Sequence, residues 1–84
     1  MNNNIPKSVK DFENHLKEDF IIKSIDAFKT LALKAKTEGK HEVAQQLTQT
    51  VSEGVRLLSN LKAGQLDEAE YEIYMKICKI AFKL

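Results

Sequence analysis

The sequence contains little that could cross-link the chain or interrupt its helices: one cysteine, one proline, three glycines and no tryptophan. A single cysteine cannot form a disulfide within the chain, and residues 1–11 lack the apolar core of a secretory signal, so we expect a cytoplasmic protein. Lysines interrupt even the most apolar segment, residues 74–84, and no run approaches the roughly 20 residues that cross a bilayer.

Charge of one sign is also scarce. Thirteen Lys and Arg residues oppose twelve Asp and Glu residues, which gives a net charge of +1. Residues 1–40 carry eight basic and six acidic groups, and residues 41–84 carry five and six, so neither half forms the strongly basic surface of a dedicated nucleic-acid-binding protein. Nucleic acid is therefore not an expected partner. A chain of 84 residues can build one core but has no material for a deep active-site cleft.

Residues that carry catalysis or bind metals are few and scattered. His15 and His41 fall on different expected elements, and Cys78 lies among apolar residues, where a thiol is usually an inert small hydrophobe. One cysteine and two distant histidines match no zinc-binding spacing. Three neighbouring carboxylates project to different faces of a helix instead of converging: Glu68, Glu70 and Glu72. The sequence therefore predicts no catalytic residue, no metal site and no cofactor, and we expect a protein that is not an enzyme.

The scarcity of glycine and proline leaves long stretches free to form helices. Residues 1–7 are polar, and we expect them to be disordered, with a single helical domain over residues 8–84. Ser8 is a good N-cap, and Asp11 three residues later gives an acidic form of the capping box, so a helix should begin here. No glycine or proline then occurs before Gly39, and any earlier break has to be inferred from the hydrophobic pattern.

The hydrophobic pattern of residues 8–38 changes phase part-way along. At about 100° per residue, two apolar stripes lie about 120° apart around the helix. The first stripe contains Val9, Phe12, Leu16 and Phe20, and the second contains Ile21, Ile25, Phe28, Leu31, Ala32 and Ala35. Because one straight helix could not bury both stripes against the same neighbour, we predict a break near residues 17–20, with Asp19 as the cap of the second part.

Two glycines mark the later helix ends. Gly39 can close a helix in the left-handed conformation, and Gly64 repeats this signal before Asp67 starts the last helix. Between them, residues 41–62 place apolar side chains at alternating steps of three and four, which predicts a packing seam. The seam includes Leu47, Val51 and Leu58. Gly54 also lies in it, where it either lets a neighbouring helix approach closely or marks a local kink. The whole pattern predicts an all-α fold, a small antiparallel bundle of four helices of which the first is short.

Two surfaces are candidates for binding a partner protein. The last expected helix is apolar over about two thirds of its circumference, more than the stripe of about 100° that one face of a surface helix requires. We expect its flank formed by Tyr71, Met75 and Phe82 to bind a partner or a second copy; the alternative is that these side chains complete the core. Ile22 and Leu33 lie outside the main stripe of their helix and form the second candidate, with packing against the first helix as the alternative. Three lysines are expected to be solvated, with a weak anion-binding surface as the alternative: Lys29, Lys36 and Lys40.

One segment resembles known helical families. Residues 28–51, FKTLALKAKTEGKHEVAQQLTQTV, resemble one tetratricopeptide hairpin, although Thr48 stands where that repeat has an aromatic residue. The matching positions are Phe28, Leu31, Ala32, Ala35, Gly39 and Ala44. Residues 20–84 are also similar, in length, helix order and glycine turn, to the three-helix MIT domain of ESCRT-associated proteins, and residues 1–19 have no counterpart. That resemblance implies binding of a short helical segment in the groove between the third and fourth expected helices.

These observations favour a small non-enzymatic interaction module: an adaptor, regulator or inhibitor that binds another protein through a helical groove or an exposed apolar helix face. Self-association through the last helix is the related expectation. The alternative is a peripheral membrane protein, because residues 76–84, KICKIAFKL, form a basic amphipathic segment of the kind found in interfacial anchors. The acidic start of the same helix argues against strong binding to anionic lipid.

Overall fold

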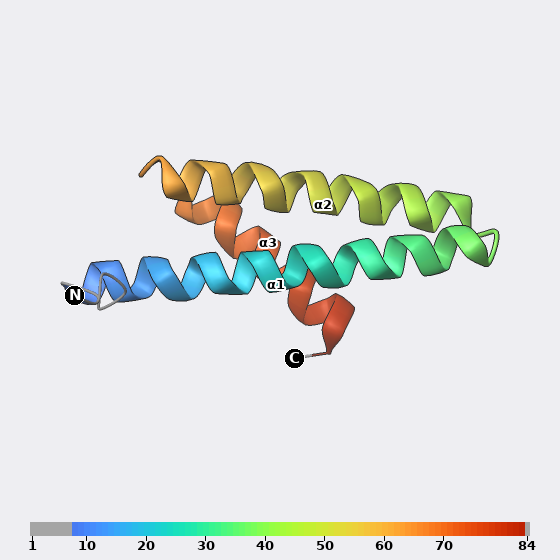
Figure 1. Ribbon diagram of the computed structural model, residues 1–84, viewed down its shortest axis with the longest axis horizontal. Helices are drawn as coiled ribbons and strands as arrows, with labels where there is room; N and C mark the ends of the chain where they lie inside the picture. The colour runs from blue at the N-terminus through green and yellow to red at the C-terminus, as the bar shows by residue number, and fades with distance from the viewer. Residues whose placement is uncertain (1–7, 84) are drawn as a thin grey trace, which may run out of the picture.

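The computed structural model describes residues 8–83, which form three α-helices (Figure 1). Helix α1 spans Val9–Thr37, α2 spans His41–Lys62 and α3 spans Glu68–Phe82. The first two lie side by side as an antiparallel hairpin, and α3 crosses one side of that hairpin obliquely (Figure 1). The predicted all-α class is confirmed, whereas the predicted number of four helices is wrong. The expected disorder of residues 1–7 falls outside the described residues.

The predicted break near residues 17–20 does not occur, because α1 continues through it as one helix of 29 residues. The prediction assumed that both apolar stripes must be buried. Instead, Val9, Phe12 and Leu16 remain 75%, 50% and 52% exposed, so the two stripes never compete for one neighbour. Helix α2 has only 22 residues, and the first turns of α1 extend past its end (Figure 1).

Charged residues at the expected break join α1 to its surroundings instead of capping a new helix. Lys17 Nζ lies 2.9 Å from Glu68 Oε2 at the start of α3. Glu18 Oε1 lies 3.9 Å from Lys62 Nζ near the end of α2. Asp19, the expected cap, pairs with Lys23 one turn later on α1. Surface pairs of this kind each contribute only about 0.2–1 kcal/mol, but here they hold a continuous helix against both neighbours.

The helix ends follow short-range rules. The Ser8 hydroxyl accepts a hydrogen bond from the Asp11 amide at 3.1 Å, as the capping prediction required. Gly39 and Gly64 adopt φ angles of 77° and 73°, the left-handed conformation that glycine reaches without strain. The Asp67 carboxylate caps α3 by accepting hydrogen bonds from the backbone amides of residues 69 and 70. These predicted ends are confirmed.

The core lies where α3 crosses the hairpin. All three helices contribute to it, and its buried members are Ile21, Ile25, Phe28, Leu57, Leu61, Tyr71, Tyr74 and Cys78. The Phe28 ring packs against Tyr74 edge-on, with ring centroids 6.3 Å apart, and against Phe82 at 4.8 Å. The seam residues predicted on α2 are only partly buried against this cluster: Leu47, Val51 and Leu58. The fully buried position is Leu57, which is 1% exposed.

Gly54 lies at a close approach of the three helices. A Cβ atom at this position would lie 2.7 Å from Tyr74 Oη of α3 and 2.8 Å from Ile25 Cγ1 of α1, which confirms the predicted close approach. Beside it, Ser24 Oγ donates a hydrogen bond to the carbonyl of Ile21 at 2.8 Å, so the Tyr74 hydroxyl is the donor in its own 2.5 Å bond to Ser24 Oγ. Glycine and a small serine together let Tyr74 reach across the hairpin.

The described helices also bear on membrane insertion. Within residues 8–83, no helix combines the length and apolarity that crossing a membrane requires.

Candidate functional site

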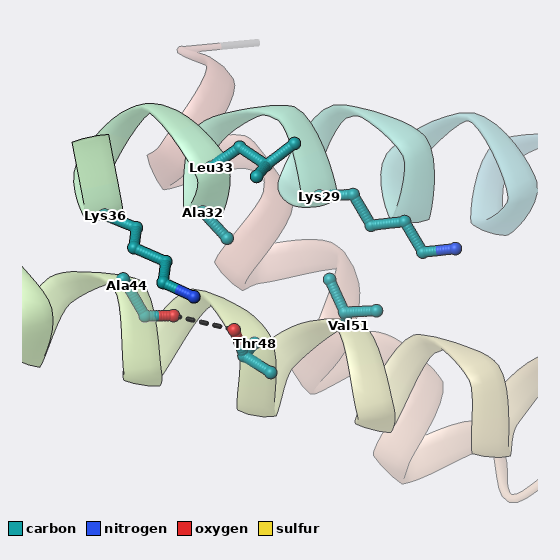
Figure 2. A pocket seen from close by; sticks show the side chains of 7 residues that line it. All are labelled: Lys29, Ala32, Leu33, Lys36, Ala44, Thr48 and Val51. Carbon is teal, nitrogen blue, oxygen red and sulfur yellow. Dashed lines mark hydrogen bonds between the residues drawn. The ribbon is translucent and has the colours of Figure 1, made fainter.

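A groove runs between α1 and α2 and is lined by residues of these two helices (Figure 2). It encloses about 430 Å³. Its lining consists of Lys29, Ala32, Leu33 and Lys36 from α1, with Ala44, Thr48 and Val51 from α2. In the same view α3 lies behind the hairpin, so the groove opens away from the helix that covers the core (Figure 2).

The groove exists because its floor is built from small side chains. Ala32 points toward α2 opposite Thr48, Ala44 lies one turn further along α2, and these short side chains leave the space that larger residues would fill (Figure 2). Thr48 adds little free polarity, since its Oγ1 donates to the Ala44 carbonyl at 2.8 Å. Val51 continues the floor and is partly buried against the core. The floor is therefore apolar, and its one hydroxyl is already hydrogen-bonded.

Two lysines flank this floor. Lys29 and Lys36 are seven residues apart on α1, which is two helical turns or about 10 Å. Their side chains extend from α1 on either side of Ala32, and that of Lys36 reaches toward α2 (Figure 2). Within residues 8–83 neither ammonium group takes part in an ion pair. The site therefore offers apolar surface at its centre and positive charge at both ends, without carboxylates of its own among its lining residues.

Of the two α1 residues expected to bind a partner, Leu33 lines this groove and Ile22 does not. Leu33 lines the groove and is 67% exposed, which is high for a leucine of this small protein. Ile22 is 45% exposed and is not among the lining residues. Lys29, Leu33 and Lys36 are four and three residues apart, so helical spacing already places them on one face of α1, and the structure adds the floor that α2 supplies beside them.

The expected binding flank of α3 lies elsewhere. Tyr71 is only 6% exposed, and Met75 and Phe82 are partly buried against the core cluster. The Tyr71 ring also stacks under Lys17 Nζ, 5.2 Å from the ring centroid. A different set of α3 side chains reaches the surface: Ile73, Ile77 and Ile80. Their spacing of four and three was the signal in the sequence, but the broad apolar arc concealed it.

Groups with catalytic potential do not gather in either place. His15 lies in the N-terminal turns of α1, whereas His41 begins α2 at the hairpin turn. Cys78 is 0% exposed, and burial raises the pKa of its thiol, which favours the unreactive protonated form. Burial also raises the pKa of Tyr74 to about 12. Among residues 8–83, no three His, Cys, Asp or Glu side chains lie close enough together to hold a metal ion.

The chain matches no protein-family model, and it shows no match to curated proteins or to solved structures. The tetratricopeptide and MIT resemblances therefore stay predictions. Any function has to be argued from the groove and from the exposed face of α3.

Proposed function

We propose that this protein is a non-enzymatic protein-binding module that accepts an amphipathic helix of a partner in the groove between α1 and α2. The observation that carries the proposal is the pair Lys29 and Lys36, placed two turns apart around an apolar floor. The partner helix would present aliphatic side chains to the floor and acidic side chains to the lysines.

The apolar floor supports the affinity of such a complex. A helix that lies in a groove buries side chains at positions i, i+3, i+4 and i+7 along one of its faces. Leu33 on the rim and Val51 on the floor supply exposed or partly exposed aliphatic surface for these contacts. Each buried CH₂ group contributes about 0.8 kcal/mol, so a few aliphatic anchors outweigh exposed charge pairs.

The lysines support the choice of partner. Because they are seven residues apart, carboxylates seven residues apart on one face of a partner helix could meet both ammonium groups. Exposed ion pairs of this kind add only about 0.2–1 kcal/mol each, but they favour acidic partners over basic ones and speed up association. Two lysines on an apolar floor do not resemble the longer basic stripe that binds nucleic acid.

Site-specific photo-crosslinking in the native cell tests the proposal. A photoreactive phenylalanine analogue at Leu33 is expected to trap a partner protein, and mass spectrometry should place the cross-link in a segment with alternating aliphatic and acidic positions. The same analogue at Lys34, the next residue along the chain and outside the groove lining, serves as the matched control. Equal cross-linking at both positions, or a cross-linked segment without acidic residues, would contradict the proposal.

A further inference from the structure

Helix α3 carries an apolar stripe that no described part of the chain covers. Ile73, Ile77 and Ile80 are 60%, 41% and 80% exposed. Their spacing of four and three residues places them on one side of the helix. The C-terminal turns of α3 extend past α1 on the side away from α2 (Figure 1). Three neighbouring exposed isoleucines on one helix face are typical of an interaction surface.

The stripe continues into the space between α3 and α2. Ile77 lines three adjoining hollows of about 250, 320 and 510 Å³. The hollow nearest the C-terminal end of α3 also contains Val43 and Leu47 of α2, with Phe28 of α1. Apolar side chains therefore lie beside Ile77 toward the C-terminal end of α3, whereas polar side chains of α2 such as Gln46 and Glu53 line the largest hollow. A second helix laid along the stripe could insert apolar side chains at the C-terminal end and polar ones beside α2.

The charges of α3 are segregated along its length. Its first turns contain Glu68, Glu70 and Glu72, and its later turns contain Lys76, Lys79 and Lys83. Glu68 pairs with Lys17, and Glu70 pairs with Arg56. Within residues 8–83, Glu72 and the three lysines have no ion-pair partner. A helix with an acidic start and a basic end is complementary to a copy of itself that runs in the opposite direction.

We infer that the occupant of the stripe is α3 of a second copy of this chain, packed antiparallel. With Ile77 next to the twofold axis, Ile73 faces Ile80 of the second copy, and the stripe is covered along its whole length. The same register places Glu72 level with the interval between Lys79 and Lys83 of the second copy. A parallel arrangement would instead set lysines against lysines, so the charge pattern selects the antiparallel one.

This inference is independent of the proposed function, because the stripe and the α1/α2 groove share no lining residue. If both hold, the dimer displays two lysine-flanked grooves, and a partner with two acidic helices gains from effective concentration without any new contact.

Sedimentation equilibrium of the full chain tests the inference, with Ile77→Lys as the disruptive variant. We expect wild type to form a dimer. We expect the variant to have a dimer dissociation constant at least tenfold higher. Ile22→Lys is the matched control, since Ile22 is 45% exposed on α1 and Ile77 is 41% exposed. If Ile77→Lys lowers the helical content in circular dichroism, Ile80→Lys replaces it, because that side chain is 80% exposed. A monomer at every wild-type concentration, or equal loss in the control, overturns the inference.

Three further measurements test the orientation of the two copies and the kind of partner. Lys76 approaches its own counterpart near the twofold axis, so Lys76→Gln should tighten the dimer, a gain that misfolding cannot produce. Nitroxide labels compared by pulsed electron resonance should give a short distance at position 76 and a clearly longer one at position 69, where the two labels lie about 20 Å apart along the helix axes. Equal distances at both positions indicate a parallel pair and overturn the antiparallel assignment.

Flotation of a monomeric protein with phosphatidylcholine and phosphatidylserine vesicles would assign the stripe to a membrane surface instead.

Discussion

The hydroxyl of Tyr74 fills the space beside Gly54 that a side chain would otherwise occupy, with 2.7 Å between Tyr74 Oη and the position of a Cβ atom. Because Ile25 Cγ1 lies at 2.8 Å from the same position, the contact joins all three helices. A glycine inside a helix costs about 1 kcal/mol relative to alanine, so its presence on α2 needs a compensating contact, and Tyr74 provides it.

Gly54→Ala should lower the free energy of unfolding although alanine is the better helix former. Overpacking costs about 1–3 kcal/mol and the gain in helix propensity is about 1 kcal/mol, so we expect a net loss of up to about 2 kcal/mol. Urea denaturation followed by circular dichroism measures it. Ser59→Ala, on an exposed position of the same helix, reports propensity alone and should be neutral or slightly stabilising. An increase in stability for Gly54→Ala would show that the three helices are not in contact there.

Alkaline pH should weaken the fold through Tyr74. Burial raises the pKa of this phenol from the ordinary value of 10.0 to about 12, so the folded state holds its proton more tightly than the unfolded state does. Its contribution to the free energy of unfolding is complete below the unfolded pKa and is lost as the pH rises through the folded pKa. Urea titrations at increasing pH should therefore show falling stability over this interval. Tyr74→Phe should flatten the fall, though not abolish it, because burial also raises the pKa of Tyr71 and Cys78.

Two phenylalanines of α1 should differ sharply on truncation. Phe28 is 1% exposed in the core, and Phe28→Ala should cost about 3–5 kcal/mol through lost transfer energy and a cavity. Phe12 is 50% exposed on the first turns of the helix, and Phe12→Ala should change stability by less than about 0.5 kcal/mol. Thermal or urea unfolding of both variants checks this. Similar costs would mean that the start of α1 packs on the core, as the four-helix prediction supposed.

The sequence predicted the helix ends better than the number of helices. Capping by Ser8 and Asp67 and the left-handed turns at Gly39 and Gly64 depend on residues within a few positions of one another, so they can be read locally. The break at residues 17–20 was an inference about distant packing. It failed because a phase shift forces a bend only if both stripes are buried, and whether the first stripe is buried depends on where α2 ends.

The candidate site was only partly predictable for the same reason. The breadth of the apolar arc on α3 indicated a surface beyond the core. It did not indicate which residues form that surface: Tyr71 is buried and Ile73 is exposed. The oblique crossing of α3 over the hairpin decides which side of α3 is buried (Figure 1). Leu33 could be singled out as an apolar residue outside its stripe. Helical spacing also places Lys29 and Lys36 beside it, but the apolar floor between them depends on which residues of α2 the hairpin brings opposite Ala32.

The charge preference of the α1/α2 groove tests the proposed binding of an acidic partner helix most directly. A fluorescent amphipathic helical peptide, with leucines on one face and two glutamates seven residues apart beside them, serves as the probe for anisotropy titrations. Lys29→Glu combined with Lys36→Glu should weaken binding of this peptide at least tenfold. A second peptide, with lysines in place of the glutamates, should bind wild type weakly and this double variant more tightly. Lys23→Glu combined with Lys34→Glu makes the same change in net charge outside the groove lining and should leave Kd nearly unchanged. Equal weakening by both double variants, or a peptide that binds none of the proteins, would contradict an acidic helix as the ligand of this groove.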